Sequence, residues 1–197
     1  MRRVIEVLVA TEAPVDELAK AADALEAVAS SLESYPTAKG WSGFAETANA
    51  GDPHGFFDSS PVIGRANPLA PPVNVEVIDG KVEGRATFGS AYEGPPGCVH
   101  GGYVAAAFDE VLGMTQSISG TPGMTGTLTI RYRRPTPLHT ELRFEGVLLG
   151  VEGRKIRTEG RLYANGEVTA EAEAIFISVD FSKMAELAQR RDGGVSA

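Results

Sequence analysis

Two polar residues interrupt a stretch of small and apolar residues near the middle of the chain. His100 is followed by Gly101 and Gly102, and Asp109 lies nine positions after the histidine. Glycine lets a ligand approach the backbone closely, and unpaired N–H groups at the start of a helix can stabilise a developing oxyanion. A carboxylate can activate a water molecule or attack a carbonyl carbon directly. These residue types suit attack on a carbonyl group, but the two glycines could instead serve only to form a tight turn.

The segment that carries these residues is predicted to be a loop that runs into a buried helix. The Pro-Pro-Gly run at 95–97 is incompatible with a helix before His100. From residue 103 to about 115 nearly every residue is apolar or small, so we expect a helix that is covered nearly all round. A carboxylate at Asp109 in such a helix costs free energy unless it is paired or hydrated. It therefore marks either a site or a carboxylate satisfied by a local backbone cap.

The spacing of His100 and Asp109 restricts how they could cooperate. At about 100° per residue, nine helical steps turn the side chain by roughly 900° and raise it by about 13 Å. Two residues of one helix at this spacing point to opposite sides and cannot act on the same atom. Either their roles are unrelated, or one site combines the His100 end of one subunit with Asp109 of another.

Strand signals flank the predicted helix on both sides. Apolar residues alternate over 73–77, Asp79-Gly80 suits a hairpin turn, and residues 81–88 return. A second hairpin signal is Asn165-Gly166. The four strands predicted after the helix are 124–134, 139–149, 154–163 and 167–180. Two strands, one apolar helix and four strands suit an α+β domain in which an antiparallel sheet curls around the helix.

The loop ending in His-Gly-Gly, the small-residue helix with Asp109, and the segment TGTLTIRYRRPTPL at 125–138 together resemble the hotdog-fold acyl-CoA thioesterase superfamily. The most similar branch is that of the phenylacetate-pathway and thioesterase-superfamily-member enzymes. The resemblance extends over roughly 73–179. It implies a hotdog fold, in which a curved antiparallel sheet wraps one long central helix, here with an N-terminal helical extension.

The resemblance also implies a site. Hotdog domains pair side by side with the active site at the seam, so Gly101 and Gly102 of one subunit would face Asp109 of the other. Thr125 lies where the family has a Ser or Thr near the acid, although threonine is ordinary in a strand. We expect His100 to support the site rather than act as its base. Glu110 is the alternative acid, because a related hotdog branch uses a glutamate.

Basic residues are concentrated in one part of an acidic chain. The net charge is -8, which argues against non-specific binding of nucleic acid, yet eight of the 18 Lys and Arg residues fall within 131–161. Arginine binds phosphate well, and coenzyme A carries phosphates. The candidate coenzyme A-binding residues are Arg131, Arg133, Arg134, Arg154 and Lys155. The alternative is that these residues form cross-strand salt bridges with Glu141, Glu145, Glu152 or Glu159.

Other chemistries are less well supported by the sequence. Cys98 and His100 are too close in the chain to form a good nucleophile–base pair, and no third orienting group is evident. The three histidines are scattered without ligand spacing, so no metal site is expected. A single cysteine excludes an internal disulfide and favours a cytoplasmic location. No apolar run reaches membrane-spanning length, and residues 1–10 are too short and acid-interrupted for a signal peptide.

The N-terminal part is less clearly defined. Residues 15–33 are predicted to be a helix with one apolar face, which either packs on the domain or binds a partner. Residues 34–72 include the large aromatic residues Trp41, Phe44, Phe56 and Phe57 and form either a wrapped segment or a lid. The expected organisation is therefore an N-terminal part at 1–72, a hotdog domain at 73–182 and a C-terminal tail at 183–197.

The function predicted from these observations is hydrolysis of an acyl-CoA to a free acid and coenzyme A. No cofactor is expected, since coenzyme A is part of the substrate, and the protein should be a homodimer or a dimer of dimers that binds neither nucleic acid nor membrane. One alternative is an acyl-CoA-binding or sensing module without turnover, although the acid is present. Another is a hotdog dehydratase or hydratase, whose histidine and acid usually have a different spacing.

Overall fold

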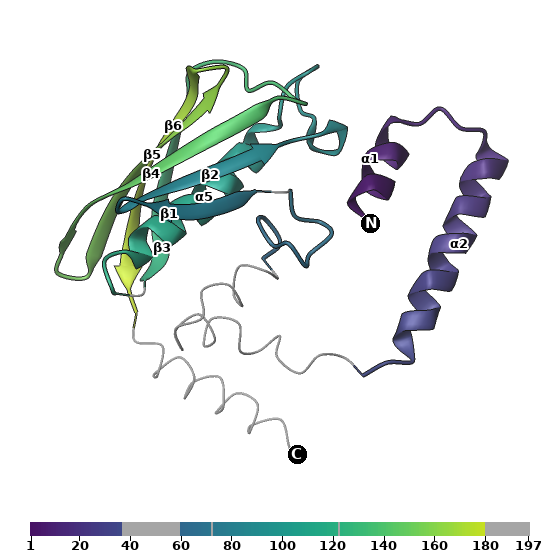
Figure 1. The fold of residues 1–197 in the computed structure, drawn as a ribbon, viewed down its shortest axis with the longest axis horizontal. Helices are drawn as coiled ribbons and strands as arrows, with labels where there is room; N and C mark the ends of the chain where they lie inside the picture. The colour runs from purple at the N-terminus through teal and green to yellow at the C-terminus, as the bar shows by residue number, and fades with distance from the viewer. Residues whose placement is uncertain (37–59, 72, 122, 180–197) are drawn as a thin grey trace.

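The computed structural model describes residues 1–36, 60–71, 73–121 and 123–179, and its centre is a curved six-stranded antiparallel sheet around one helix (Figure 1). The α+β hotdog fold expected from the sequence is confirmed. The strands are β1 (Asn74–Ile78), β2 (Lys81–Thr87), β3 (Gly123–Tyr132), β4 (Glu141–Glu152), β5 (Lys155–Ala164) and β6 (Glu167–Ser178). The helices are α1 (Arg2–Ala10), α2 (Val15–Glu33), the short 3₁₀ helix η1 (Ser90–Tyr92) and α5 (Gly101–Ser117).

The strand order in the sheet is β1-β2-β4-β5-β6-β3, so within the described part of the chain β3 is an edge strand that pairs only with β6. Both predicted hairpin turns are present. Asp79 and Gly80 have φ of 50° and 75°, and Asn165 and Gly166 have φ of 52° and 81°. Two positive φ angles in succession are what a two-residue hairpin turn of the type favoured between twisted strands requires. The chain segment between β2 and β3, which contains α5, carries the chain from one side of the sheet to the other.

Helix α5 lies against the concave face of the sheet and forms the core with it. Its residues Val104, Phe108, Val111 and Leu112 are buried against inward side chains of the strands, and the rings of Phe108 and Phe144 meet edge to face. Burial is greatest on this face. Residues 104–115 are all buried or partly buried and Tyr103 is 37% exposed, so most of the helix surface over this range is covered, as expected. The sheet curls around the helix but does not enclose it.

Glycines in the strands let α5 approach the sheet closely. Gly146 in β4 and Gly160 in β5 are directly paired, and both face the helix. A Cβ at Gly146 would overlap the Thr115 hydroxyl, and one at Gly160 would lie 3.1 Å from a Leu112 methyl group. Any side chain at these positions would therefore push α5 away from the sheet.

Helix α1, which the sequence did not predict, fastens the N-terminal part to the domain. The Arg2 guanidinium donates to the backbone carbonyls of residues 64, 65, 67 and 70. The Glu6 carboxylate accepts from the N–H groups of Ser90 and Ala91, at 2.7 and 3.2 Å. These backbone hydrogen bonds, first that of Ser90, lower the pKa of Glu6. One helix thus joins the 64–70 loop to η1.

Helix α2 has the predicted bounds, Val15–Glu33, but not the predicted packing. None of its residues is buried, and Figure 1 shows it apart from the sheet, beyond α1. Among the described residues, the expectation that α2 packs on the domain is therefore wrong. The question of a wrapped segment or a lid falls mainly on 37–59, and the predicted tail is 183–197. Both ranges lie outside the described residues. No helix in the described part of the chain is long and apolar enough to span a membrane.

Candidate active site

His100 begins helix α5 as its N-cap residue. Its Nδ1 atom accepts the N–H of Gly102 at 3.0 Å, and its carbonyl accepts the N–H groups of Tyr103 and Val104. A ring nitrogen that accepts a backbone N–H carries no proton, so the neutral imidazole has its proton on Nε2. The side chain therefore satisfies one of the N–H groups that a helix start leaves unpaired, which is a supporting role rather than that of a base.

The two glycines that follow differ in what their backbone groups contact. The N–H of Gly102 is already donated to His100, whereas no acceptor for the N–H of Gly101 is present among the described residues. The Gly101 carbonyl accepts from the Tyr132 hydroxyl at 2.7 Å. The carbonyl of His100, in the same peptide group as the Gly101 N–H, is directed into the helix, so this N–H points outward from the helix start. Of the two candidates, only Gly101 offers a free N–H donor.

Asp109, in the middle of α5, meets Thr125 near the beginning of β3. The Thr125 hydroxyl donates to Oδ1 of Asp109 at 2.8 Å, and the Asp109 side chain is half-buried. Thr125 belongs to the edge strand β3, at a point where a bulge between Thr125 and Thr127 interrupts the pairing with β6. The carboxylate is thus oriented by a hydroxyl group and lies beside an unpaired strand edge.

Gly101 and Asp109 are far apart within one chain. Gly101 contacts Tyr132 at the end of β3, whereas Asp109 contacts Thr125 near its beginning. At about 3.3 Å per strand residue, these two points of β3 are about 20 Å apart. The helix itself also separates the two residues, because eight residues at about 1.5 Å each place Gly101 and Asp109 about 12 Å apart along α5.

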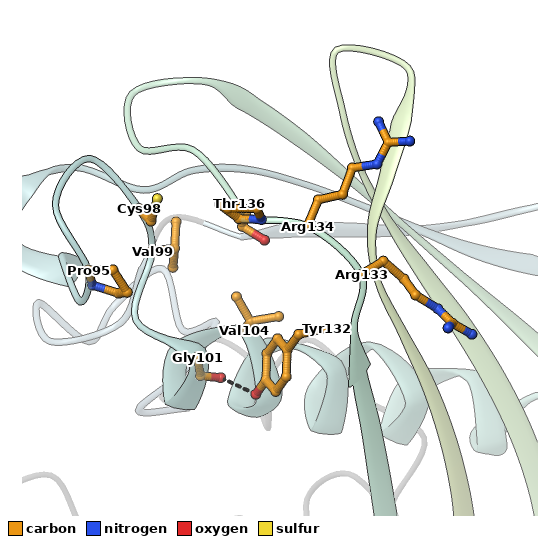
Figure 2. Close-up of a pocket in the computed structure, with 10 residues that line it drawn as sticks. Pro95, Cys98, Val99, Gly101, Val104, Tyr132, Arg133, Arg134 and Thr136 are labelled. Carbon is orange, nitrogen blue, oxygen red and sulfur yellow. Dashed lines mark hydrogen bonds between the residues drawn. The ribbon is translucent and has the colours of Figure 1, made fainter.

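A cavity of about 390 Å³ opens at the start of α5, beside Gly101 (Figure 2). Its lining residues are Pro95, Cys98, Val99, Gly101, Val104, Tyr132, Arg133, Arg134, Pro135 and Thr136. The walls are mainly apolar, and Gly101 is part of one of them. Tyr132 was not among the candidate site residues, although it lies in the segment at 125–138 on which the family resemblance depends.

The three arginines at the end of β3 form ion pairs with the neighbouring strand. Arg131 pairs with Glu173, Arg133 with Glu171 and Arg134 with Glu167, all on β6. The hydrogen bond to Glu173 raises the pKa of Arg131. Figure 2 shows the Arg133 and Arg134 side chains directed away from Gly101. The salt-bridge alternative therefore holds for these three residues, with partners on β6 rather than the four glutamates expected.

The other two basic candidates lie elsewhere. Arg154 donates to the Ser178 carbonyl, and Lys155 is paired in register with Ile177, which is opposite Met124 at the start of β3. The expected five-residue group therefore does not form one patch within the chain. Arg131, Arg133 and Arg134 lie at the Gly101 end of β3, and Arg154 and Lys155 lie toward its Thr125 end.

Glu110, the alternative acid, has a different environment from Asp109. Its Oε1 atom accepts the hydroxyl of Ser60 at 2.6 Å, and Ser60 itself is buried. Burial raises the pKa of Glu110, partly opposed by the Ser60 hydrogen bond, and the charge of Asp109 raises it further. Glu110 thus connects α5 to the 60–71 segment, whereas Asp109 faces the strand edge.

The remaining candidates are not assembled into a site. Cys98 Sγ has only a 3.6 Å contact with the Pro96 carbonyl, and no contact with His100 is found in the described residues. In that same part of the chain, no cluster of three or more His, Cys, Asp or Glu residues could hold a metal ion.

The fold and the residues at the helix start agree with what comparison with known proteins finds. The thioesterase superfamily model matches residues 96–171, which include His100, Asp109 and Thr125. The crystal structure of protein RHA08564, a thioesterase superfamily protein, is 37% identical, with a TM-score of 0.78, and the match covers 89% of this chain and 90% of that one. The chain therefore belongs to the thioesterase superfamily.

Curated relatives match over a shorter length. Acyl-coenzyme A thioesterase THEM4 of Mus musculus is 38% identical over 93 residues, which are 46% of this chain and 40% of the relative. THEM4 of Xenopus laevis is 32% identical over the same share of this chain and 42% of its own length. The match thus spans about two fifths of these relatives. A hypothetical thioesterase protein from Streptococcus pneumoniae, crystallised with coenzyme A, shares the fold, with 19% identity, a TM-score of 0.51, and coverage of 54% of this chain and 88% of that one.

Proposed function

We propose that the protein is an acyl-CoA thioesterase that hydrolyses an acyl-CoA to a free acid and coenzyme A. Membership of the thioesterase superfamily supports thioester chemistry, and the name of the THEM4 relatives supports an acyl-CoA substrate. The observation that carries the proposal is the Asp109 carboxylate, held by Thr125 beside an open strand edge on the helix that begins with a free Gly101 N–H.

In the proposed reaction Asp109 supplies the base or the nucleophile. The Thr125 hydroxyl occupies Oδ1, which leaves Oδ2 free to take a proton from water or to attack the thioester carbon. The oxyanion that forms on the carbonyl accepts the N–H of Gly101. If Asp109 acts as the base, the hydroxide formed from water attacks the carbonyl carbon, and the departing thiolate takes the proton that Asp109 removed. If Asp109 attacks directly, breaking of the C–S bond leaves an acyl–aspartyl anhydride, the thiolate takes a proton from water, and the resulting hydroxide hydrolyses the anhydride. Neither route needs a further cofactor.

The separation of Gly101 and Asp109 along α5, about 12 Å at about 1.5 Å per residue, supports a site shared by two chains. Strand β3 has one unpaired edge, and Met124 and Tyr132 on it are 50% and 54% exposed. Antiparallel pairing of two β3 strands about a two-fold axis between Leu128 and Thr129 would set Thr125 of one chain opposite Tyr132 of the other. Asp109 of one chain would then approach Gly101 of its neighbour, at two equivalent sites. We therefore propose a homodimer, alone or within a dimer of dimers.

The same pairing supports a binding site for the phosphates of coenzyme A. It would set Met124 of one chain opposite Arg133 of the other, so that Arg154 and Lys155 of the first lie near Arg131, Arg133 and Arg134 of the second. Arg154 and Lys155 form no ion pair with a described carboxylate, so a phosphate could bind them without displacing a glutamate. The three β3 arginines would have to exchange β6 carboxylates for phosphate.

A hydrolysis screen tests the proposal. Purified protein is incubated with acyl-CoAs that carry short, medium, long and aromatic acyl groups, and the released thiol is measured. We expect turnover of at least one class. Binding of acyl-CoA without thiol release would overturn the proposal in favour of a sensing module. Hydration or dehydration of an enoyl- or hydroxyacyl-CoA without thiol release would instead indicate a hydratase.

A further inference from the structure

We infer that Tyr132 is a positioning residue that acts on the oxyanion donor through Gly101. This inference depends on the proposed thioesterase function. The Tyr132 hydroxyl donates to the Gly101 carbonyl at 2.7 Å, the contact drawn as a dashed line in Figure 2. Tyr132 comes from the last position of β3, 31 residues along the chain, and is the side-chain partner that the structure shows for this glycine.

The hydrogen bond completes a chain of contacts across one peptide group. The Gly101 carbonyl and the Gly102 N–H belong to the same planar unit. Tyr132 donates to its oxygen, and its N–H donates to His100 Nδ1 at 3.0 Å. Donation at one end of a peptide and acceptance at the other polarise it and strengthen both bonds. The orientation of this peptide is therefore fixed from both sides.

Fixing this peptide also fixes the free N–H that precedes it. Gly101 has no Cβ, so rotation about its own backbone bonds costs little unless its neighbours prevent it. On one side the His100 carbonyl is held by the N–H groups of Tyr103 and Val104, and on the other the Gly101 carbonyl is held by Tyr132. Because the peptide groups on both sides of the Gly101 Cα are held by hydrogen bonds, the direction of the Gly101 N–H is fixed.

The phenol ring also limits what can occupy this position. A Cβ at Gly101 would lie 3.3 Å from both Cζ and the hydroxyl oxygen of Tyr132, closer than ordinary packing allows. The ring thus packs directly on the Gly101 backbone and forms a wall of the cavity beside it. Tyr132 is close to the proposed oxyanion without being its donor.

Loss of the hydroxyl should therefore affect the chemical step more than substrate binding. The oxyanion exists only in the transition state, so a misdirected donor lowers kcat and leaves KM nearly unchanged. Loss of an oxyanion-hole donor lowers the rate by about 100- to 1000-fold. Since Tyr132→Phe would loosen the donor without removing it, we expect kcat to fall by about tenfold.

The test compares Tyr132→Phe with Tyr163→Phe on the acyl-CoA that the wild-type protein hydrolyses best. Tyr163 is a matched control, because its hydroxyl donates to Glu145 and its ring packs under Arg143 on the outer face of β5, away from the cavity. Tyr132→Phe should lower kcat at unchanged KM, whereas Tyr163→Phe should keep the wild-type kcat.

A second measurement separates positioning from general stability. In ¹⁵N–¹H spectra, Tyr132→Phe should shift the Gly102 amide resonance, because its hydrogen bond to His100 loses the polarising donor, while the melting temperature and the size of the assembly stay close to the wild type. Wild-type kcat and an unmoved Gly102 signal in Tyr132→Phe would overturn the inference and leave the thioesterase proposal intact. A kcat loss explained entirely by a lower melting temperature would also overturn it. Absence of hydrolysis in the wild-type protein would instead refute the proposed function, and with it this role.

Discussion

Two neighbouring carboxylates on α5 have opposite surroundings. Asp109 receives the Thr125 hydroxyl beside the open edge of β3, whereas Glu110, which is partly buried, receives the hydroxyl of the buried Ser60. A group that must act on a substrate needs access to it, and only Asp109 has that access at the proposed seam.

Asp109→Asn should lower turnover by about two orders of magnitude or more, because the amide can neither take a proton nor attack the carbonyl carbon. Glu110→Gln should retain most of the activity, since the amide oxygen can still accept from Ser60. Steady-state kinetics with the best acyl-CoA, at equal melting temperature, checks both variants. Equal losses in the two variants, or none in Asp109→Asn, would contradict the assignment.

Glu110 should also make stability depend on pH. Burial raises its pKa in the folded state above the unfolded value of about 4.5. A raised carboxyl pKa contributes stability below the unfolded pKa, and this contribution is lost as the pH rises through the folded pKa. Glu110→Gln removes this ionisation. The free energy of unfolding of the variant, relative to that of the wild type, should therefore increase as the pH is raised from about 4.5 to neutrality. Urea denaturation across this range measures the difference, which would be constant if Glu110 did not contribute.

At the residue scale, the sequence predicted the candidate site residues but not all of their hydrogen-bond and ion-pair partners. Asp109 and Thr125 could be paired through the family resemblance. The donation of the Gly102 N–H to His100 could not be foreseen, since histidine is not among the preferred N-cap residues. The arginine partners depend on the β3–β6 register, which contains a bulge and joins strands far apart in sequence. Neither feature leaves a local signal.

At the scale of elements, the contact between α5 and the sheet depends on glycines in paired strands. Gly146→Ala should destabilise the protein by about 1–3 kcal/mol, because the added methyl group overlaps the Thr115 hydroxyl and forces the helix or the strand to move. Gly113→Ala is a suitable control, since a Cβ at that helix position meets no described atom within 4 Å. Thermal and urea denaturation of both variants provide the comparison. A Gly146→Ala protein as stable as the wild type would show that the helix can shift at little cost in free energy.

The elements themselves were largely predictable because their signals are local. Hairpin dipeptides and alternating residues located the six strands, and α2 was found to the residue. Helix α1 was missed, since nine residues form too short a helix to be stable alone. Its stability comes from Arg2 and Glu6, whose partners lie some sixty to eighty-five positions away. Tertiary contacts of that kind are not visible in a single sequence.

At the scale of the whole molecule, a mixing experiment tests whether two chains share each site. Gly101→Pro removes the proposed donor with little backbone strain, because Pro suits the first helical position and His100 already has ψ of 131°. Gly101→Ala, which keeps the N–H but crowds Tyr132, controls for the added bulk. Gly101→Pro and Asp109→Asn proteins should each be inactive alone.

After subunit exchange, mixed dimers would contain one site with both wild-type groups. With equal amounts and random pairing, we expect about a quarter of the wild-type activity to return. Exchange is verified with two affinity tags on the two variants. Failure to recover activity once mixed dimers are isolated would indicate that each site lies within one chain.

The open edge of β3 has a consequence for how the hydrolysis rate would depend on protein concentration. A strand with unpaired backbone groups has two fates, pairing with a copy of itself or remaining in water, and only the first would bring Gly101 and Asp109 together. Where most chains are single, the number of assembled pairs rises with the square of the chain concentration, by mass action. Halving the protein concentration in an assay would then lower the rate about fourfold rather than twofold. The activity per chain would therefore rise with protein concentration.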